Sequence, residues 1–156
     1  MSAALYVLIG IQATGKSNWA SANAARLGAE IVASDEIRNE LEAAGIAAEH
    51  EGDRVFAIFE ARVARWLDAG RNVIADATHA RRAWRANVLS LARQRDARTV
   101  AVWFQAPLDV SRARNACKPG GARWGERVIQ DEVLVEMWQH LDAPGLDEFD
   151  DIWKID

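Results

Sequence analysis

The sequence is poor in the residues that build a disulfide framework, a metal site or a membrane span. Its 156 residues include one cysteine, Cys117, so no disulfide forms within the chain and a reducing compartment fits best. The three histidines are scattered without metal-ligand spacing. No apolar run reaches the roughly 18 residues of a transmembrane helix. The apolar opening, residues 3–9, lacks the basic start of a signal peptide. We therefore expect a cytoplasmic protein that makes no membrane contact.

Repeats, low-complexity tracts and linkers are also missing. The length corresponds to one domain over residues 1–156. Half of the residues are hydrophobic and 27% are charged, an ordinary globular balance that excludes intrinsic disorder.

Charge is distributed unevenly along the chain. Residues 1–53 carry 3 basic and 8 acidic side chains, residues 54–127 carry 15 and 6, and residues 128–156 carry 1 and 9. The central segment therefore has a net charge of +9 (15 − 6), which an anionic substrate could use for docking. Its arginines could equally form solvated helix faces. Charge alone leaves both interpretations open.

Short apolar segments alternate with longer amphipathic ones. Strands are predicted at residues 5–9, 30–33, 72–75, 99–104 and 151–155. Helices are predicted at residues 16–27, 34–44, 52–69, 80–95, 107–116 and 126–141, with a loop at 118–125. Strands separated by helices predict a three-layer α/β fold with a parallel sheet of about five strands. The tryptophans other than Trp124 are expected in the core.

A glycine-rich loop follows the first predicted strand. Residues 10–17, GIQATGKS, fit the pattern G-x-x-x-x-G-K-S and open a helix, which is the context of a P-loop. Main-chain N–H groups of such a loop surround phosphates, and the helix dipole favours anions. We expect Lys16 to reach the β- and γ-phosphates of ATP and Ser17 to bind Mg²⁺. The predicted nucleotide-binding residues are Gly10, Gln12, Ala13, Thr14, Gly15, Lys16 and Ser17. The fold is then a P-loop NTPase or kinase fold, with a lid at about residues 114–127.

Two aspartates stand at predicted strand ends, where ligands bind in parallel sheets. Asp35 is a candidate general base, and Arg38, on the same helix face, is a candidate ligand for a phosphate of the acceptor. The alternative is a helix-capping aspartate with a surface ion pair. Asp76 is a candidate Mg²⁺ ligand through water, or a turn aspartate.

A group of cations flanks the glycine-rich loop after residue 116. Arg114, Lys118 and Arg123 are candidates to stabilise the charge that develops in phosphoryl transfer. Because Arg112 and Arg114 are two residues apart on a helix, only one of them is expected to face the phosphates. The alternative is a flexible loop with solvated arginines. Trp124 either stacks on a base or packs in the loop.

Taken together, these segments resemble the P-loop kinases of the polynucleotide 5′-kinase type. The resemblance rests on residues 10–17, on Ser34-Asp35-Glu36-Ile37-Arg38, on Asp76-Ala77-Thr78-His79 followed by Arg81-Arg82, and on Arg114-Asn115. It implies transfer of the ATP γ-phosphate, with Mg²⁺, to the 5′-hydroxyl of DNA or RNA. The implied site residues are Lys16, Ser17, Asp35, Arg38 and Arg114. Lys118 stands where that family has a second lid arginine, which leaves Lys118 or Arg123 for this role. His79 replaces an asparagine, and Ala13 replaces a frequent glycine.

Three functions remain open from the sequence. The first is a polynucleotide 5′-kinase, which the resemblance and the cationic centre favour. The second is a small-molecule kinase acting on a sugar, nucleoside or antibiotic hydroxyl, which the short chain and acidic net charge favour. The third is a nucleotide-dependent switch without transfer chemistry.

Overall fold

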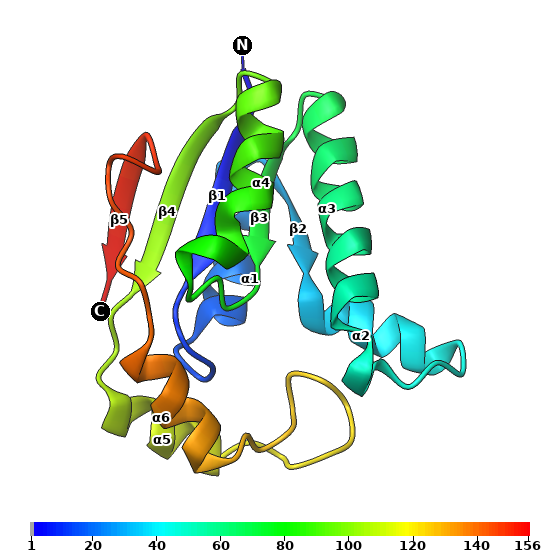
Figure 1. Cartoon of the computed structure of the whole chain (residues 1–156), viewed down its shortest axis with the longest axis vertical. Helices are drawn as coiled ribbons and strands as arrows, with labels where there is room; N and C mark the ends of the chain where they lie inside the picture. Colours follow the sequence, from blue (N-terminus) through cyan, green and yellow to red (C-terminus); the bar gives the residue numbers. More distant parts are fainter. Residues whose placement is uncertain (1) are drawn as a thin grey trace.

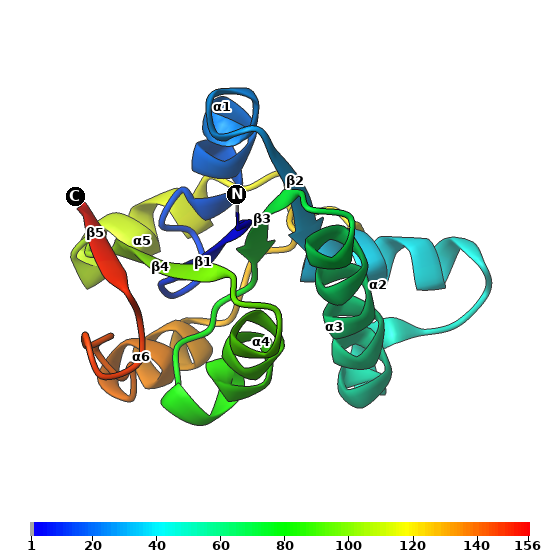
Figure 2. The ribbon, with the colours of Figure 1, turned by 90° about the horizontal axis from the view of Figure 1, so that it is seen from above.

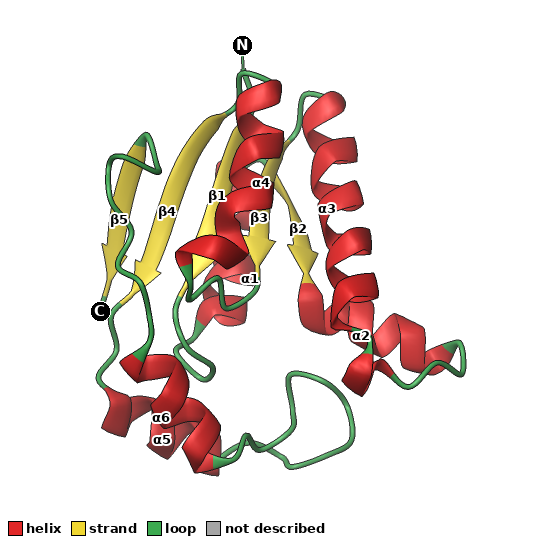
Figure 3. Ribbon diagram, viewed as in Figure 1, coloured by secondary structure: helices red, strands yellow, loops and turns green. Residues whose placement is uncertain are grey.

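The protein is built on one five-stranded parallel sheet (Figure 3). The computed structural model describes residues 2–156. The strands are β1 (Ala4–Ile9), β2 (Ala29–Ala33), β3 (Asn72–Asp76), β4 (Arg98–Phe104) and β5 (Asp151–Ile155). Their order is β2-β3-β1-β4-β5, and each neighbouring pair is parallel. The predicted parallel α/β P-loop fold is thereby confirmed.

Helices cover the two faces of the sheet and its carboxyl edge. They are α1 (Lys16–Leu27), α2 (Ser34–Ala43), α3 (Gly52–Asp68), α4 (Arg82–Gln94), α5 (Leu108–Ala116) and α6 (Asp131–Gln139), with a short 3₁₀ turn at Ala48–His50. Figure 2 shows α1 on one face and α3 and α4 on the other. In Figure 1, α5, α6 and the loop before α6 lie beyond the carboxyl ends of the strands. No helix within residues 2–156 is long and apolar enough to cross a membrane.

The core forms two layers because side chains alternate along each strand. Leu5, Val7 and Ile9 of β1 pack in a cluster with α3 and α4, whereas Tyr6 and Leu8 pack in a second cluster with α1. All six residues of β1 are buried. A fully apolar strand therefore holds the P-loop that follows it in a rigid position.

The sequence overestimated the last long helix. Residues 126–141 were predicted helical, but α6 spans only Asp131–Gln139. The side chain of Asn115 donates to the Ile129 carbonyl at 2.7 Å and accepts from the Ile129 N–H at 2.9 Å. The Ile129 carbonyl is an acceptor that a helix over 126–141 would need, so the loop before α6 is longer than predicted.

The cationic centre is largely neutralised by the acidic ends of the chain. Nine arginines of residues 54–127 form ion pairs, eight of them with acids from residues 1–53 or 128–156 and one with Asp68. The pairs are Arg62–Glu40, Arg71–Glu30, Arg82–Asp147, Arg85–Glu148, Arg95–Asp68, Arg98–Asp151, Arg112–Asp131, Arg123–Glu36 and Arg127–Glu42. Exposed pairs stabilise a fold only slightly. Their effect on the field is larger, because eight acids from the ends of the chain offset most of the +9 net charge of the central segment.

Two tryptophans differ from the predicted core assignment. Trp84 on α4 is 47% exposed and Trp138 on α6 is 50% exposed. Periodicity cannot separate an apolar residue on the core face from one on the wall of an open cavity. Trp84 lies on such a wall, as described below.

Candidate active site

The candidate active site lies at the carboxyl edge of the sheet. The loop after β1 carries Lys16 and Ser17, the helix after β2 carries Asp35, and β3 ends at Asp76. These residues line one cavity of about 800 Å³, which is large enough for a nucleotide phosphate chain and a second ligand. The parallel sheet thus brings together the residues that the sequence predicted on separate strand ends.

The P-loop curls tightly between β1 and α1. Gly15 has a φ of +92°, and Ala13 adopts a φ of +61°. A Cβ on Gly10 would lie 3.1 Å from the Thr14 hydroxyl oxygen and 3.1 Å from Cβ of Phe104, so little room exists for a side chain there. No side chain of residues 2–156 caps the start of α1. The first N–H groups of α1 are therefore available to an anion.

The Lys16 side chain folds back onto the P-loop. Its ammonium donates to the carbonyl oxygens of Gly10 at 3.0 Å and Ile11 at 2.6 Å. Burial lowers the pKa of Lys16 to about 8, although the nearby carboxylates of Asp76 and Asp35 oppose the shift. A buried cation between two carboxylates and an open helix start is suited to a polyphosphate.

Ser17 and Asp76 form a direct contact below the P-loop. The Ser17 hydroxyl donates to Oδ2 of Asp76 at 2.8 Å. Burial raises the pKa of Asp76, and the Ser17 hydrogen bond partly offsets this. Within residues 2–156, no three His, Cys, Asp or Glu side chains cluster as a complete metal site. A hydroxyl beside one carboxylate nevertheless fits Mg²⁺, which keeps several waters and takes its other oxygens from phosphates.

Asp35 faces the cavity from the first turn of α2 and does not cap its own helix. The N-cap position is Ala33, and across the described chain no side chain caps α2. One carboxylate oxygen pairs with Arg38 at 3.5 Å, and the side chain of Asp35 remains 50% exposed. The backbone of Gly125 packs against this carboxylate, since a Cβ there would lie 3.6 Å from Oδ2. The geometry is that of a half-exposed carboxylate with the loop backbone beside it.

The two arginines of α5 point in different directions. A guanidinium nitrogen of Arg114 lies 3.7 Å from the position that a Cβ on Gly15 would occupy, so Arg114 reaches over the P-loop. Arg112 instead pairs with Asp131 of α6 at 2.7 Å. Arg114, rather than Arg112, therefore lies beside the phosphate-binding loop.

The two cations of the loop, Lys118 and Arg123, also lie in different places. Lys118 lines the cavity, and partial burial lowers its pKa while Asp35 opposes that shift. Arg123 is exposed and lies 3.7 Å from a carboxylate oxygen of Glu36. Of the two candidates for the second lid cation, the structure brings Lys118 to the cavity and leaves Arg123 on the outer surface.

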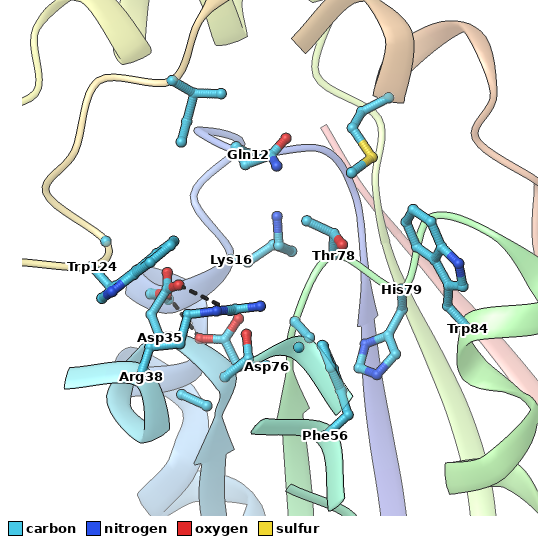
Figure 4. Close-up of a pocket in the computed structure, with 18 of the residues that line it drawn as sticks. Gln12, Lys16, Asp35, Arg38, Phe56, Asp76, Thr78, His79, Trp84 and Trp124 are labelled. Carbon is cyan, nitrogen blue, oxygen red and sulfur yellow. Dashed lines mark hydrogen bonds and ion pairs between the residues drawn. The ribbon is translucent and has the colours of Figure 1, made fainter. Parts of the chain in front are cut away.

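Trp124 joins the loop to α2. Its ring lies 5.1 Å from the Arg38 guanidinium and 3.9 Å from that of Arg127. Its indole N–H donates to Glu42 at 3.1 Å. The ring is thus occupied by arginines, and Figure 4 shows Trp124 beside Arg38 and Asp35.

The sequence did not identify Phe56 and Trp84 as cavity residues, and it marked His79 only as a departure from the family motif. Phe56 of α3 and Trp84 of α4 form walls, and His79 lies between them with Nδ1 3.0 Å from the Leu8 carbonyl (Figure 4). Burial lowers the pKa of His79 to about 4, so this residue is neutral. The helical spacing of Phe56 and Trp84 indicated a core face, and no local signal marks the walls of a cavity.

Comparisons with known proteins identify the family and the fold. A family model described as an AAA domain matches residues 5–144. A candidate kinase from Chloroflexus aurantiacus has 19% identity and a TM-score of 0.80, covering 100% of this chain and 89% of that one. A gluconokinase from Sinorhizobium meliloti has 16% identity and a TM-score of 0.63, covering 98% and 82%.

A chain of the Pnkp1/Rnl/Hen1 RNA repair complex has 20% identity and a TM-score of 0.70. It aligns with 90% of this chain, which spans 44% of that protein. No curated protein matches the sequence. The structural likenesses show a shared fold, and the matched family model shows that the chain belongs to the AAA domain family, with its P-loop at residues 10–17.

Proposed function

We propose that this chain is an ATP-dependent kinase that transfers the γ-phosphate to a hydroxyl acceptor. One observation carries the proposal: the P-loop lysine, the Ser17–Asp76 pair and the reachable Asp35 carboxylate line a single cavity. A carboxylate in the same cavity as the P-loop can accept the proton of an attacking hydroxyl, a role that nucleotide binding alone does not require.

The proposed reaction uses groups of this chain in defined roles. Lys16 and the start of α1 hold the β- and γ-phosphates. Asp35 accepts the proton of the acceptor hydroxyl while the hydroxyl oxygen bonds to the γ-phosphorus. The bond between the γ-phosphorus and the β–γ bridging oxygen breaks, and ADP is released. Arg114 and Lys118 stabilise the negative charge on the transferred group. Ser17, and Asp76 through water, would hold Mg²⁺, which neutralises phosphate charge when bound.

Two acceptor classes are supported by different observations. A polynucleotide 5′ end is supported by Arg38 next to Asp35 and by the likeness to a chain of an RNA repair complex. A small alcohol is supported by the ion pairs of nine arginines in the central segment and by the loop backbone beside Asp35. These pairs leave less positive charge for a polyanion, which favours the small alcohol.

Transfer of labelled γ-phosphate to a panel of 5′-hydroxyl oligonucleotides and small alcohols tests the proposal. Asp35→Asn is expected to lower the transfer rate by about 10²–10⁴-fold with ATP affinity retained, as for loss of a general base. Lys16→Ala is expected to abolish transfer.

Asp96→Asn is a matched control, because Asp96 lies in a remote turn with a positive φ that asparagine tolerates. Normal turnover by Asp35→Asn would remove the base assignment. ATP hydrolysis that ignores every acceptor would favour a switch.

A further inference from the structure

The part of the cavity formed by α3 and α4 has the character of a separate ligand subsite. Phe56 and Glu60 come from α3, and Trp84 and Asn87 come from α4. Figure 4 shows Trp84 across the cavity from Asp35 and Trp124. The Arg81 guanidinium lies 5.3 Å from the centre of the Trp84 ring, but Trp84 is still 47% exposed on the cavity wall, and this exposed part is an apolar surface that a ligand can cover.

A polar pair lines the same cavity. The Asn87 side-chain amide donates to Oε1 of Glu60 at 2.8 Å, and this exposed hydrogen bond links α3 to α4. Three polar groups remain for a ligand: Oε2 of Glu60, and the side-chain oxygen and second amide hydrogen of Asn87. Hydroxyl groups both donate and accept, so neighbouring hydroxyls on one molecule complement this set.

The charges around this subsite disfavour a phosphate-rich acceptor. Asp53 and Glu60 are negative and line the cavity. Of the nearby arginines, Arg38 pairs with Asp35 and Arg127 with Glu42, whereas the Arg81 guanidinium lies 5.3 Å from the centre of the Trp84 ring. Bringing several phosphates beside Asp53 and Glu60 would place like charges together, and a phosphate that bound Arg38 or Arg127 would compete with their ion pairs.

We infer that the acceptor is a small, uncharged polyhydroxylated molecule of carbohydrate type, whose body packs on Trp84 and Phe56 and whose non-reacting hydroxyls bind the Glu60–Asn87 pair. This inference rests on the proposed kinase function, because it assigns the second ligand of the same cavity. It makes Glu60 and Asn87 specificity-determining residues, at a distance from the phosphate-binding loop.

The test compares D-glucose, D-ribose and D-galactose with cyclohexylmethanol, which has one hydroxyl and a similar apolar body, and with a 5′-hydroxyl oligonucleotide. We expect transfer to at least one sugar and none to the other two acceptors at equal concentration. Glu60→Gln and Asn87→Ala should each raise the KM for the sugar by about 10- to 100-fold, the range for a lost hydrogen bond to a charged or buried partner. The KM for ATP should stay unchanged.

Controls separate a local effect from a general one. Glu30→Gln, at the opposite end of β2, and Asn23→Ala, on the outside of α1, should leave both KM values unchanged. Transfer to the oligonucleotide but to no sugar overturns the inference and leaves the proposed kinase function intact. Unchanged sugar KM in both subsite variants also overturns it. Absence of Asp35-dependent transfer to any acceptor removes the kinase function itself, and the inference falls with it.

Discussion

The side-chain amide of Asn39 forms two hydrogen bonds with the main chain of Trp124. Its oxygen accepts from the Trp124 N–H at 2.8 Å, and its nitrogen donates to the Trp124 carbonyl at 3.2 Å. The pair connects α2 to a loop 85 residues away in sequence, and Gly125, next along the loop, lies beside Asp35. Asn39 therefore holds this part of the loop against α2, next to the candidate base.

Asn39→Ala should loosen the loop without unfolding the protein. Two hydrogen bonds at about 0.5–1.5 kcal/mol each are lost, so we expect amide exchange at Trp124 and Gly125 to quicken by roughly tenfold. Hydrogen exchange followed by mass spectrometry measures this. Asn23→Ala, whose amide bonds only within α1, is the control. Equal exchange rates in the two variants would show that Asn39 does not hold the loop.

The lowered pKa of Lys16 predicts a pH dependence of ATP binding. Because that pKa is about 8 in the nucleotide-free protein, Lys16 loses its charge as pH rises above 8 and must regain a proton to bind phosphates. ATP affinity should fall about tenfold per pH unit above pH 8, with proton uptake. Calorimetry in two buffers of different ionisation enthalpy measures both. Arginine does not titrate in this range, so the Lys118→Arg variant should keep the pH dependence of ATP affinity. Loss of the pH dependence in this variant would assign the titration to Lys118 instead of Lys16.

The Ser17 hydroxyl should stabilise the protein even without nucleotide. Ser17→Ala leaves the buried Asp76 carboxylate without this donor, and we expect a loss of about 1–3 kcal/mol in the free energy of unfolding. The pKa of Asp76 should rise further. Urea denaturation measures the loss, and Ser17→Thr should restore most of it. Equal stability of Ser17→Ala and the parent protein would mean that the contact contributes nothing.

His79 should make the fold sensitive to acid. Its pKa is lowered from 6.5 to about 4 in the folded chain, so between these values the unfolded chain binds a proton that the folded chain does not. Stability is therefore lost as pH falls from about 6.5 to about 4. His79→Asn removes this group, and asparagine tolerates the φ of +46° at this position.

The measurement for His79 is the free energy of unfolding at pH 7 and pH 4.5. We expect the parent protein to lose on the order of 2 kcal/mol more than His79→Asn over this range. The exposed His140→Asn should behave like the parent. Parallel losses in the parent and His79→Asn would contradict the prediction.

Ala13 carries backbone strain that glycine would relieve. Its φ of +61° lies in the left-handed region, which costs a residue with a Cβ about 1–2 kcal/mol. Glycine also gives the unfolded chain more conformational freedom, which offsets part of the relieved strain. Ala13→Gly should therefore raise the free energy of unfolding by about 0.5–1 kcal/mol. Thermal unfolding measures the change. Ala24→Gly, inside α1, should destabilise by about 1 kcal/mol. Destabilisation by Ala13→Gly would refute the strain argument.

Local patterns in the sequence were sufficient for the sheet, for most helices and for the P-loop. An apolar run such as residues 4–9 has one stable place, between two layers, and glycine with lysine and serine at fixed offsets defines the turn that follows it. Because strand ends in a parallel sheet share one edge, the meeting of Lys16, Asp35 and Asp76 also followed from the sequence.

Tertiary contacts decided everything that depended on partners distant in the chain. Only the folded structure shows that the flanking acids pair with central arginines, that Asn115 binds the main chain of Ile129, and that Arg114 rather than Arg112 reaches the P-loop. The attachment of the loop to α2 through Asn39 is likewise visible only there. Only the folded structure makes Trp84 a cavity wall. Sequence periodicity records which face of an element is apolar, whereas the distances that set electrostatics and hydrogen bonding exist only after the elements have packed.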